Sequence, residues 1–177
     1  MPESEVTLVP ATLAYADALL AFELENRAFF EQWIASRGDA FYAVEYVLAH
    51  LAAAEHDRAR DRSYAYLAFA GSTLVGRVNL RGVERQQFHR ATLGYRIGEP
   101  HTGRGYATAA VRLVLREACG PLKLYCVEAV VRDGNPASHH VLERNAFRRY
   151  GRSTQSVRHH GRWYDMHHYE RHCAAAP

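Results

Sequence analysis

A glycine-rich turn carries the clearest chemical signal in this sequence of 177 residues. Gly103 and Gly105 allow the backbone to bend tightly and to approach a ligand without an intervening Cβ. The segment 105–118 that follows has the apolar spacing of a helix, without a capping side chain of its own. Its first N–H groups and the positive end of its dipole would therefore face the turn. These features predict an anion site of the kind that holds phosphate, and Arg104 adds a mobile positive charge.

The amino-acid sequence of this turn excludes two nucleotide-binding motifs. Residues 102–107 lack the lysine and the spacing of a nucleotide-triphosphate loop, and no third glycine follows as in a dinucleotide-binding turn. The net charge of +3 is mildly basic and scattered, whereas nucleic-acid binding usually needs a denser basic stripe, so we predict no direct nucleic-acid partner. Arginines expected near the anion site, where they would suit a polyanionic cofactor, are Arg81, Arg85, Arg90, Arg96, Arg104, Arg112 and Arg116.

A second motif follows the nearly continuous apolar stretch 123–131, which predicts a buried strand. Asn135 is a good N-cap, Pro136 suits the first helical position, and Ser138 can join a local hydrogen bond. Taken alone, these residues are explained by a capped helix. Beside an anion-binding turn, the same residues would face the ligand.

The cysteines and histidines offer other chemistry. Cys119, Cys126 and Cys173 show neither a disulfide framework nor zinc spacing, and we expect Cys119 and Cys126 to be small buried apolar residues. Among the 11 histidines are three adjacent pairs, at 139–140, 159–160 and 167–168. Neighbours on a strand point to opposite faces, so a strand pair cannot chelate as a unit. Histidines 159 or 160 could meet 167 or 168 only if the register of a hairpin allowed it, and we expect surface histidines and no metal.

The elements that must position these motifs alternate between helical and strand patterns. We predict helices over 11–27, 27–36, 105–118 and 136–145, and a further helix that Asp39 caps and that decays into the solvated charged run 55–62. We predict strands over 6–9, 64–70, 74–80, 91–97, 123–131, 147–159 and 163–171, with a polar connection over 81–90. Turns at Gly71-Ser72 and His160-Gly161 make two of the connections hairpins. The order predicts one α/β domain over residues 1–177.

Bulk composition agrees with a globular protein. The chain is 48% hydrophobic and 23% charged. No stretch approaches 18 apolar residues, and residues 1–5 are acidic where a secretory signal would be basic. We therefore expect a cytoplasmic protein with no membrane partner.

The turn resembles the Gln/Arg-x-x-Gly-x-Gly/Ala signature of the GNAT superfamily of N-acetyltransferases. Thr102, Gly105 and Ala107 occupy its three positions, and Thr102 departs from Gln or Arg while leaving the main-chain amides in place. The segments 135–147 and 161–165 are similar to the RimJ/RimL-like branch, which acetylates N-terminal amines of ribosomal proteins. The segments 25–33, 76–80 and 88–95 fit that branch as well. The family usually has glycine where this chain has Ala146, which should be tolerated if its φ is negative.

This resemblance implies a fold, a cofactor and a set of site residues. The fold would be a mixed, mostly antiparallel, twisted sheet of about seven strands flanked by helices. Acetyl-coenzyme A would bind through Ile97, Thr102, Gly103, Arg104, Gly105, Tyr106, Ala107, Thr108, Asn135 and Ser138. A splayed strand over 91–97 would hold the pantetheine arm, with the N–H near Ile97 polarising the thioester and Asn135 as a ligand of the arm. Ser138 would protonate the departing thiolate.

The acceptor and the general base are left open by the resemblance. The leading acceptor is an N-terminal α-amine, with a ribosomal protein as a candidate partner. The alternatives are a small amine such as a polyamine, amino acid or antibiotic, and a non-catalytic acyl-coenzyme A sensor. Residues 155–158 hold no carboxylate for a base, and Glu25, Glu84, Glu99 and His101 are substitutes of which we assign none. Aromatic residues that would wall the acceptor site, or belong to the core, are Phe29, Phe30, Trp33, Tyr64 and Tyr66.

Overall fold

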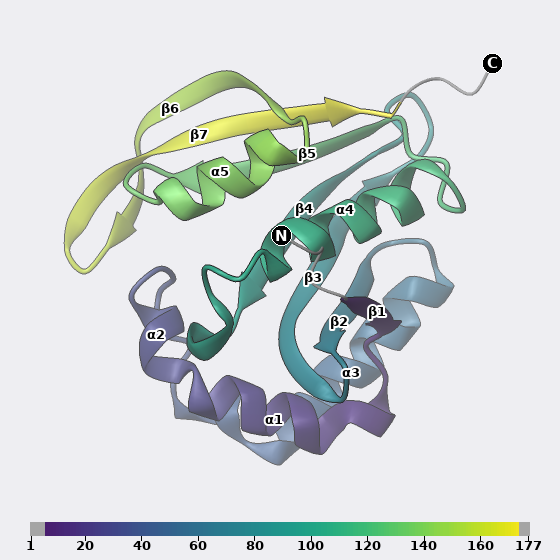
Figure 1. Cartoon of the computed structure of the whole chain (residues 1–177), viewed down its shortest axis with the longest axis vertical. Coiled ribbons are helices and arrows are strands. Elements are labelled where there is room, and N and C mark those ends of the chain that lie inside the picture. Colours follow the sequence, from purple (N-terminus) through teal and green to yellow (C-terminus); the bar gives the residue numbers. More distant parts are fainter. Residues whose placement is uncertain (1–5, 174–177) are drawn as a thin grey trace.

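A seven-stranded sheet forms the centre of the computed structural model, which describes residues 6–173 (Figure 1). Its order is β1-β2-β3-β4-β5-β7-β6, and every neighbouring pair is antiparallel except β4 with β5. The strands are β1 (Thr7–Pro10), β2 (Tyr64–Ala70), β3 (Thr73–Glu84), β4 (Arg90–Ile97), β5 (Cys126–Arg132), β6 (Arg148–His159) and β7 (Arg162–His172). This architecture confirms the expected fold, while the acidic residues 1–5 lie outside the described part.

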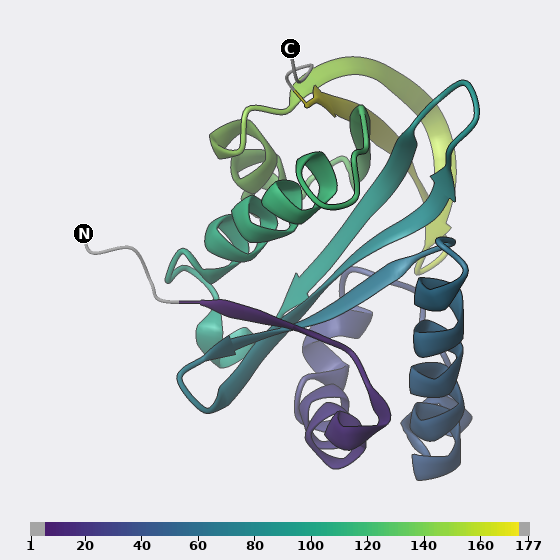
Figure 2. The same cartoon turned by 90° about the vertical axis from the view of Figure 1, so that its right-hand side faces the viewer.

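Helices cover both faces of the sheet (Figure 2). The α-helices are α1 (Ala16–Glu25), α2 (Arg27–Glu31), α3 (Val44–Ala59), α4 (Tyr106–Cys119) and α5 (Pro136–Arg144), and the 3-10 helices are η1 (Leu13–Tyr15), η2 (Asp39–Tyr42) and η3 (Glu99–His101). Val111 and Val114 of α4 belong to one apolar core, and Leu19 of α1 and Leu51 of α3 belong to a second core. No helix within residues 6–173 is long and apolar enough to cross a membrane.

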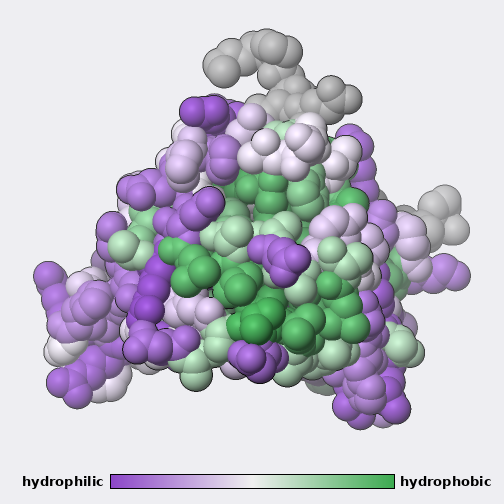
Figure 3. All heavy atoms as spheres, turned by 90° about the horizontal axis from the view of Figure 1, so that it is seen from below, coloured by the Kyte–Doolittle hydropathy of each residue, from purple (hydrophilic) through white to green (hydrophobic). Residues whose placement is uncertain are grey.

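Apolar side chains gather at the centre of the face seen from the side of α1 and α3 (Figure 3). The exposed large hydrophobic residues of these two helices are Leu24, Val44, Tyr46 and Leu48. Hydrophilic residues surround this area, as the purple rim in the figure shows. The patch lies on the outer surface of the helices, away from the sheet they cover.

The first helices are shorter than their apolar spacing predicts. The predicted helix over 11–27 begins as a 3-10 turn and becomes α-helical at Ala16, and the helix predicted to reach residue 36 ends at Glu31. Asp39 does not cap α3, because it opens η2 ahead of that helix, and its exposed carboxylate pairs with Arg27 at 2.8 Å. The N-cap of α3 is Ala43, which makes no side-chain capping bond. The chain therefore makes a 3-10 turn where the sequence predicted the start of the helix, and α3 begins only at Val44.

Two strands differ from their predicted bounds by more than one residue. The predicted polar connection over 81–90 is partly strand, because β3 continues to Glu84 through an irregularity between Arg81 and Glu84. The predicted strand over 123–131 begins at Cys126. The charged run after residue 55 forms the end of α3, as predicted.

The two parallel strands β4 and β5 separate halfway along their length. Arg90 to Leu93 pair with Cys126 to Ala129, and the pairing stops there. Beyond this point β4 stays on β3, where Gly94 faces Asn79, while β5 stays on β7. The sheet is therefore open between 94–97 and 130–132, and main-chain groups on both edges of the opening lack a strand partner. This confirms the splay expected for the strand over 91–97.

Cys119 corrects the expectation for the cysteines. It forms a disulfide with Cys173 across 54 residues of sequence, where the end of α4 meets the end of β7. The spacing of the cysteines in the sequence does not indicate this disulfide, because the tertiary fold brings the two residues together across 54 residues of chain. Cys126 is buried and free, as predicted.

Ala146 also differs from expectation, since its φ is +59° and not negative. The N–H of Ala146 donates to Glu143 O at 2.9 Å, and the N–H of Phe147 donates to Leu142 O at 3.0 Å. This is the Schellman arrangement, which favours glycine at its left-handed position. The helix end tolerates a strained alanine there because both capping bonds form.

Candidate active site

A cavity of about 990 Å³ is lined by both edges of the opening between β4 and β5. One end, which we call the turn end, consists of the lining residues within 101–108, all except Arg104, and the cavity-lining part of α5. The other end, the arginine end, consists of Arg37, Arg77, Arg81, Arg96 and Arg132 with the residues of α2 and α3 beside them. Tyr95 and Ile97 of β4 also line the cavity, at the edge of the opening between the strands. The cavity therefore joins the two faces of the sheet through its open part.

The turn end has the backbone that its glycines predict. Gly103 and Gly105 have φ values of +70° and +82°, in the left-handed region. Gly105 is the N-cap of α4 and makes no side-chain capping bond, so the first N–H groups of the helix point into the turn. The hydroxyl of Thr102 donates to Glu99 O at 2.9 Å and closes the turn on η3.

Nine of the ten sequence-predicted binding residues line this cavity, namely Ile97, Thr102, Gly103, Gly105, Tyr106, Ala107, Thr108, Asn135 and Ser138. Arg104 is the exception, since its exposed side chain is not part of the lining. For four of the seven arginines expected near the turn, the expectation is wrong. Arg85 and Arg90 form ion pairs with Asp61 and Glu84, and Arg81 and Arg96 line the opposite end of the cavity.

The backbone N–H of Ile97 points toward the opening. Gly98 N–H donates to Val75 O on β3 at 3.0 Å, and successive N–H groups of a strand alternate between its two sides. Gly76 makes the close approach of β3 to this point feasible. A Cβ at Gly76 would lie 2.4 Å from Ile97 Cδ1 and 2.6 Å from Arg96 O.

Ser138 is held between α5 and β4. Its N–H donates to Asn135 Oδ1 at 3.1 Å, so the capped-helix interpretation of this motif is correct. Its hydroxyl lies 2.8 Å from the hydroxyl of Tyr95, and burial raises the pKa of Tyr95 to about 12. Our sequence interpretation missed Tyr95 as a site residue. The sequence held no signal for it, because its hydroxyl partner Ser138 is 43 residues away along the chain.

A buried ion-pair cluster organises the arginine end. Glu23 of α1 is 1% exposed and accepts bonds from Arg77 Nη1 at 2.6 Å and Arg96 Nη1 at 2.9 Å. Arg77 also donates to His50 Nε2 at 2.8 Å. Burial, followed by the charges of Arg77 and Arg37, lowers the pKa of His50 to about 4. Neither Glu23 nor His50 stood out in the sequence, because their partners are distant along the chain.

Carboxylates are missing from the described lining of this cavity. No aspartate or glutamate within residues 6–173 lines it. Among the four substitutes considered for a general base, Glu84 pairs with Arg90 at 3.1 Å, while Glu25 and Glu99 are exposed and outside the lining. His101 does line the cavity, with its ring 6.2 Å from that of Tyr106. The arrangement offers proton donors at both ends and no carboxylate base.

The aromatic residues divide into two groups. Phe29, Phe30 and Trp33 line the arginine end, as expected of acceptor-site walls. Tyr64 and Tyr66 are core residues, 8% and 4% exposed. The guanidinium carbon of Arg132 lies 5.4 Å from the Trp33 ring centre and 4.8 Å from that of Tyr164.

Two histidines contradict the expectation of a surface position. His159 and His167 are 7% and 5% exposed, because the β6–β7 hairpin folds against other elements. His159 Nε2 lies 2.9 Å from Gln32 O, and His167 Nε2 lies 3.0 Å from Asp133 Oδ1. The register sets His167 opposite Arg152 and His159 opposite Arg162, so the paired histidines do not meet. A group of potential metal-binding side chains outside the cavity is Cys126, Glu170 and His172, whose ligand atoms lie within 4.8 Å of one another.

Known proteins resemble this chain over most of its length. The model of the acetyltransferase (GNAT) domain matches residues 5–148. The probable N-acetyltransferase YjcK of Bacillus subtilis (strain 168) is 34% identical over 158 residues, which are 88% of this chain and 87% of that protein.

Solved structures show the same fold. The ribosomal-protein-S5-alanine acetyltransferase of Vibrio fischeri has a TM-score of 0.92 at 18% identity, covering 97% of this chain and 96% of that one. RimJ of Mycobacterium smegmatis, in complex with CoA-disulfide, has a TM-score of 0.90 at 24% identity, covering 99% and 86%. Together with the open strand pair and the glycine turn, the family match shows that this chain belongs to the acetyltransferase (GNAT) domain family.

Proposed function

We propose that this acetyltransferase transfers the acetyl group of acetyl-coenzyme A directly to the N-terminal α-amine of a protein, in the cytoplasm, with a ribosomal protein as one candidate. The observation that carries the proposal is the opening between β4 and β5, which joins a phosphate-type turn to a separate end of the same cavity. Support for the acceptor comes from the structural likeness to ribosomal-protein acetyltransferases. Support for the donor comes from neighbours solved with coenzyme A or acetyl-coenzyme A.

The described residues fit the proposed donor. The N–H groups of 105–108 and the dipole of α4 would hold its pyrophosphate. The unpaired edge of β4 would hold the pantetheine arm, and the side-chain nitrogen of Asn135 would be available to it because Oδ1 caps α5. When bound, acetyl-coenzyme A supplies the thioester that the amine attacks. The N–H of Ile97 would stabilise negative charge on the thioester oxygen.

Ser138 would give the leaving sulfur its proton. Its hydroxyl is oriented by Tyr95 at 2.8 Å, and Tyr95 remains protonated at neutral pH because its pKa is about 12. Tyr95 would keep its own proton and hold the Ser138 hydroxyl toward the cavity, and solvent would return to Ser138 the proton that it gives to the sulfur. Tyr95 acts through Ser138 and is a positioning residue in this scheme.

The acceptor amine must be neutral to attack, and the cavity favours that form without a carboxylate base. A positive charge close to an amine disfavours the ammonium form. Arg37, Arg77 and Arg81 supply such charges at the end where the amine would enter. A free α-amine has a pKa near 8, so a small shift and a water molecule suffice for deprotonation.

A direct assay tests this proposal. The protein is incubated with acetyl-coenzyme A and peptides whose only free amine is either the N-terminus or a lysine side chain, with polyamines and amino acids as further acceptors. Mass spectrometry should show acetylation of the N-terminal peptides above the others. Acetylation of small amines alone would favour the small-molecule alternative, and cofactor binding without transfer to any acceptor would favour a sensor.

A further inference from the structure

We propose that the acceptor carries an anionic group, a carboxylate or a phosphate, close to its amine, and that the arginine end binds this group. The inference rests on the proposed function and extends it to the chemistry that an acceptor must present.

The arginine end has more positive than negative charge. Five guanidinium groups reach it from separate parts of the chain: Arg37 after α2, Arg77 and Arg81 on β3, Arg96 on β4 and Arg132 on β5. The buried carboxylate beside them is that of Glu23, which bonds Arg77 and Arg96. Of the five arginines, Arg77 is buried, Arg96 and Arg132 are half-buried, and Arg37 and Arg81 are exposed to the cavity solvent. One carboxylate leaves this end with a net positive charge, and a cleft lined by one sign of charge attracts a ligand of the opposite sign.

His50 adds a further donor to the same place. Arginine can only donate, so His50 Nε2 accepts from Arg77 and the ring proton must be on Nδ1. The ring is neutral at pH 7, because its pKa is lowered to about 4. The Nδ1–H group of His50 can therefore donate a hydrogen bond to an anion.

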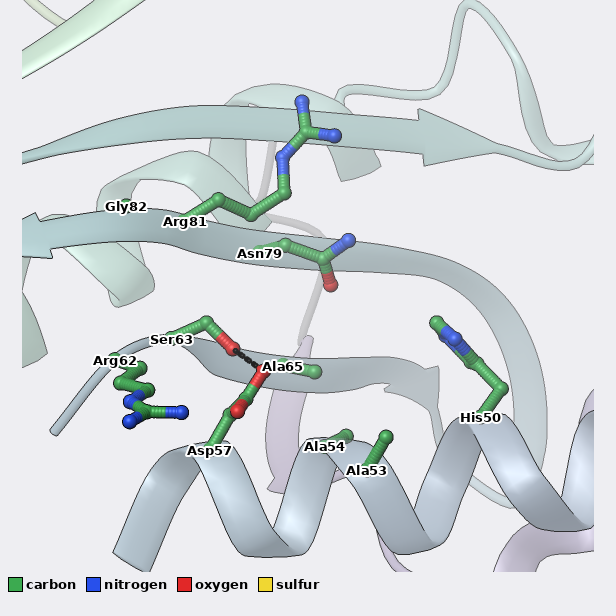
Figure 4. A pocket seen from close by; sticks show the side chains of 10 residues that line it. All are labelled: His50, Ala53, Ala54, Asp57, Arg62, Ser63, Ala65, Asn79, Arg81 and Gly82. Atoms are coloured by element: carbon green, nitrogen blue, oxygen red, sulfur yellow. Dashed lines mark hydrogen bonds between the residues drawn. The ribbon is translucent and has the colours of Figure 1, made fainter. Parts of the chain in front are cut away.

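Asn79 provides a hydrogen-bond acceptor at this end, in contrast to the donors of the arginines and His50. Its Oδ1 is buried and has no hydrogen-bond partner within residues 6–173. In Figure 4 this oxygen points toward α3, while Arg81 extends in the opposite direction, across β4. Gly94 makes room for Arg81, since a Cβ there would lie 3.0 Å from Arg81 Nη2. A molecule with an amine and an anionic group would supply both the donor that Asn79 lacks and the charge that the arginines lack.

There is room for a chain beyond the reacting amine. A second cavity of about 330 Å³ shares His50, Asn79 and Arg81 with the first and continues between α3 and β2 (Figure 4). Its carboxylate, Asp57, lies 3.5 Å from the Ser63 hydroxyl that donates to it. The arginine end is thus open toward a neighbouring space that the rest of an acceptor can occupy.

Matched acceptors test the inference. Tetrapeptide amides that begin with alanine carry two glutamates, two phosphoserines, two glutamines or two lysines at the next positions, and L-alanine is compared with L-alaninamide. We expect kcat/KM for the glutamate or phosphoserine peptide to exceed that of the glutamine peptide about tenfold, and the lysine peptide to be slowest. A preference confined to L-alanine over its amide would identify the carboxylate of a small acceptor as the source.

Two variants show whether the arginine end causes the preference. Arg81→Gln should reduce the ratio of acidic to neutral acceptor about tenfold, whereas Arg116→Gln, an exposed residue of α4 outside the cavity, should leave the ratio unchanged. The thermal shift with coenzyme A verifies that both variants are folded.

The inference and the proposed function fail in different ways. Equal rates for acidic and neutral acceptors, or fastest reaction of the lysine peptide, would overturn the inference and leave N-terminal acetylation standing. Absence of transfer to every amine would overturn the proposed function. In that event, binding of N-acetylated glutamate and glutamine peptides to the coenzyme A-loaded protein still decides, and equal affinities would overturn the inference.

Discussion

The two ends of the cavity are built on different principles. The turn end comes from two short contiguous segments, and its proposed ligand groups are backbone N–H groups oriented by Gly105 and by the start of α4. The arginine end comes from side chains far apart in sequence, with Glu23 separated from Arg77 by 54 residues and from Arg96 by 73. The first end depends on backbone conformation, and the second depends on charge balance.

This difference bears on how each end responds to substitution. A backbone site keeps its ligand groups when side chains change, so Thr102 can stand where the GNAT signature has Gln or Arg. A site made of charged side chains changes its preference with a single residue, because each buried charge depends on its partners. We therefore expect variants at the turn end to affect donor binding and variants at the arginine end to affect stability or acceptor choice.

The largest effect should come from Glu23→Gln, which removes the carboxylate between Arg77 and Arg96. Leaving buried charges without their partner typically costs about 3–5 kcal/mol. Urea unfolding should show a loss of this size, whereas Glu25→Gln, on the exposed side of the same helix, should change stability by less than about 0.5 kcal/mol. Equal free energies of unfolding for the two variants would show that Glu23 does not stabilise the protein through Arg77 and Arg96.

Gly105→Val should abolish donor binding at the turn end. Coenzyme A at 100 times its Kd stabilises a protein by about 2.7 kcal/mol, and the bulky residue at φ +82° would distort the turn that provides the amides. Thermal melts with and without coenzyme A measure this shift. Gly71→Val places the same strain in a hairpin outside the cavity, at φ +60°, and should keep the shift. A wild-type melting curve unaffected by saturating coenzyme A would refute the donor assignment.

Ser138→Ala tests the proposed proton donor, which lies on α5 at the turn end. A positioned proton donor contributes about 10²-fold or more, so kcat should fall by that factor while donor affinity stays nearly the same. Tyr95→Phe should reduce kcat less, because it removes only the orienting partner. Melting temperatures of the same variants separate the alternatives. A destabilised Ser138→Ala protein with normal kcat would leave the serine as part of a helix cap alone.

Arg104→Ala should have the smallest effect, since this exposed side chain lies outside the cavity lining. Its charge close to the turn should improve donor affinity about two- to fivefold at low salt, as expected of an exposed electrostatic contact. Titration calorimetry at low and high ionic strength should show that the difference disappears with salt. A difference that persists at high salt would mean that Arg104 contributes through geometry and would weaken the view of the turn as a backbone site.

The sequence predicted those features that depend on a few neighbouring residues. Gly103 and Gly105 require the conformation that the turn has, Asn135 caps α5, and the pair Gly71-Ser72 joins β2 to β3. The splay of β4 could be expected only through the family resemblance. These features follow from local backbone geometry, which short segments carry with them into any fold.

Only the tertiary structure decided the features that need distant partners. The carboxylate of Asp39 pairs with Arg27 instead of capping a helix, and Cys119 meets Cys173 at a corner of the sheet. Ala146 takes a left-handed conformation because the capping bonds of α5 require it. The cluster around Glu23 has no signature in the sequence, because charge pairing is decided by which surfaces the packing of α1 and α3 on the sheet brings together. Local geometry thus determined where the donor would bind, and long-range packing determined the charge of the end that would receive the acceptor.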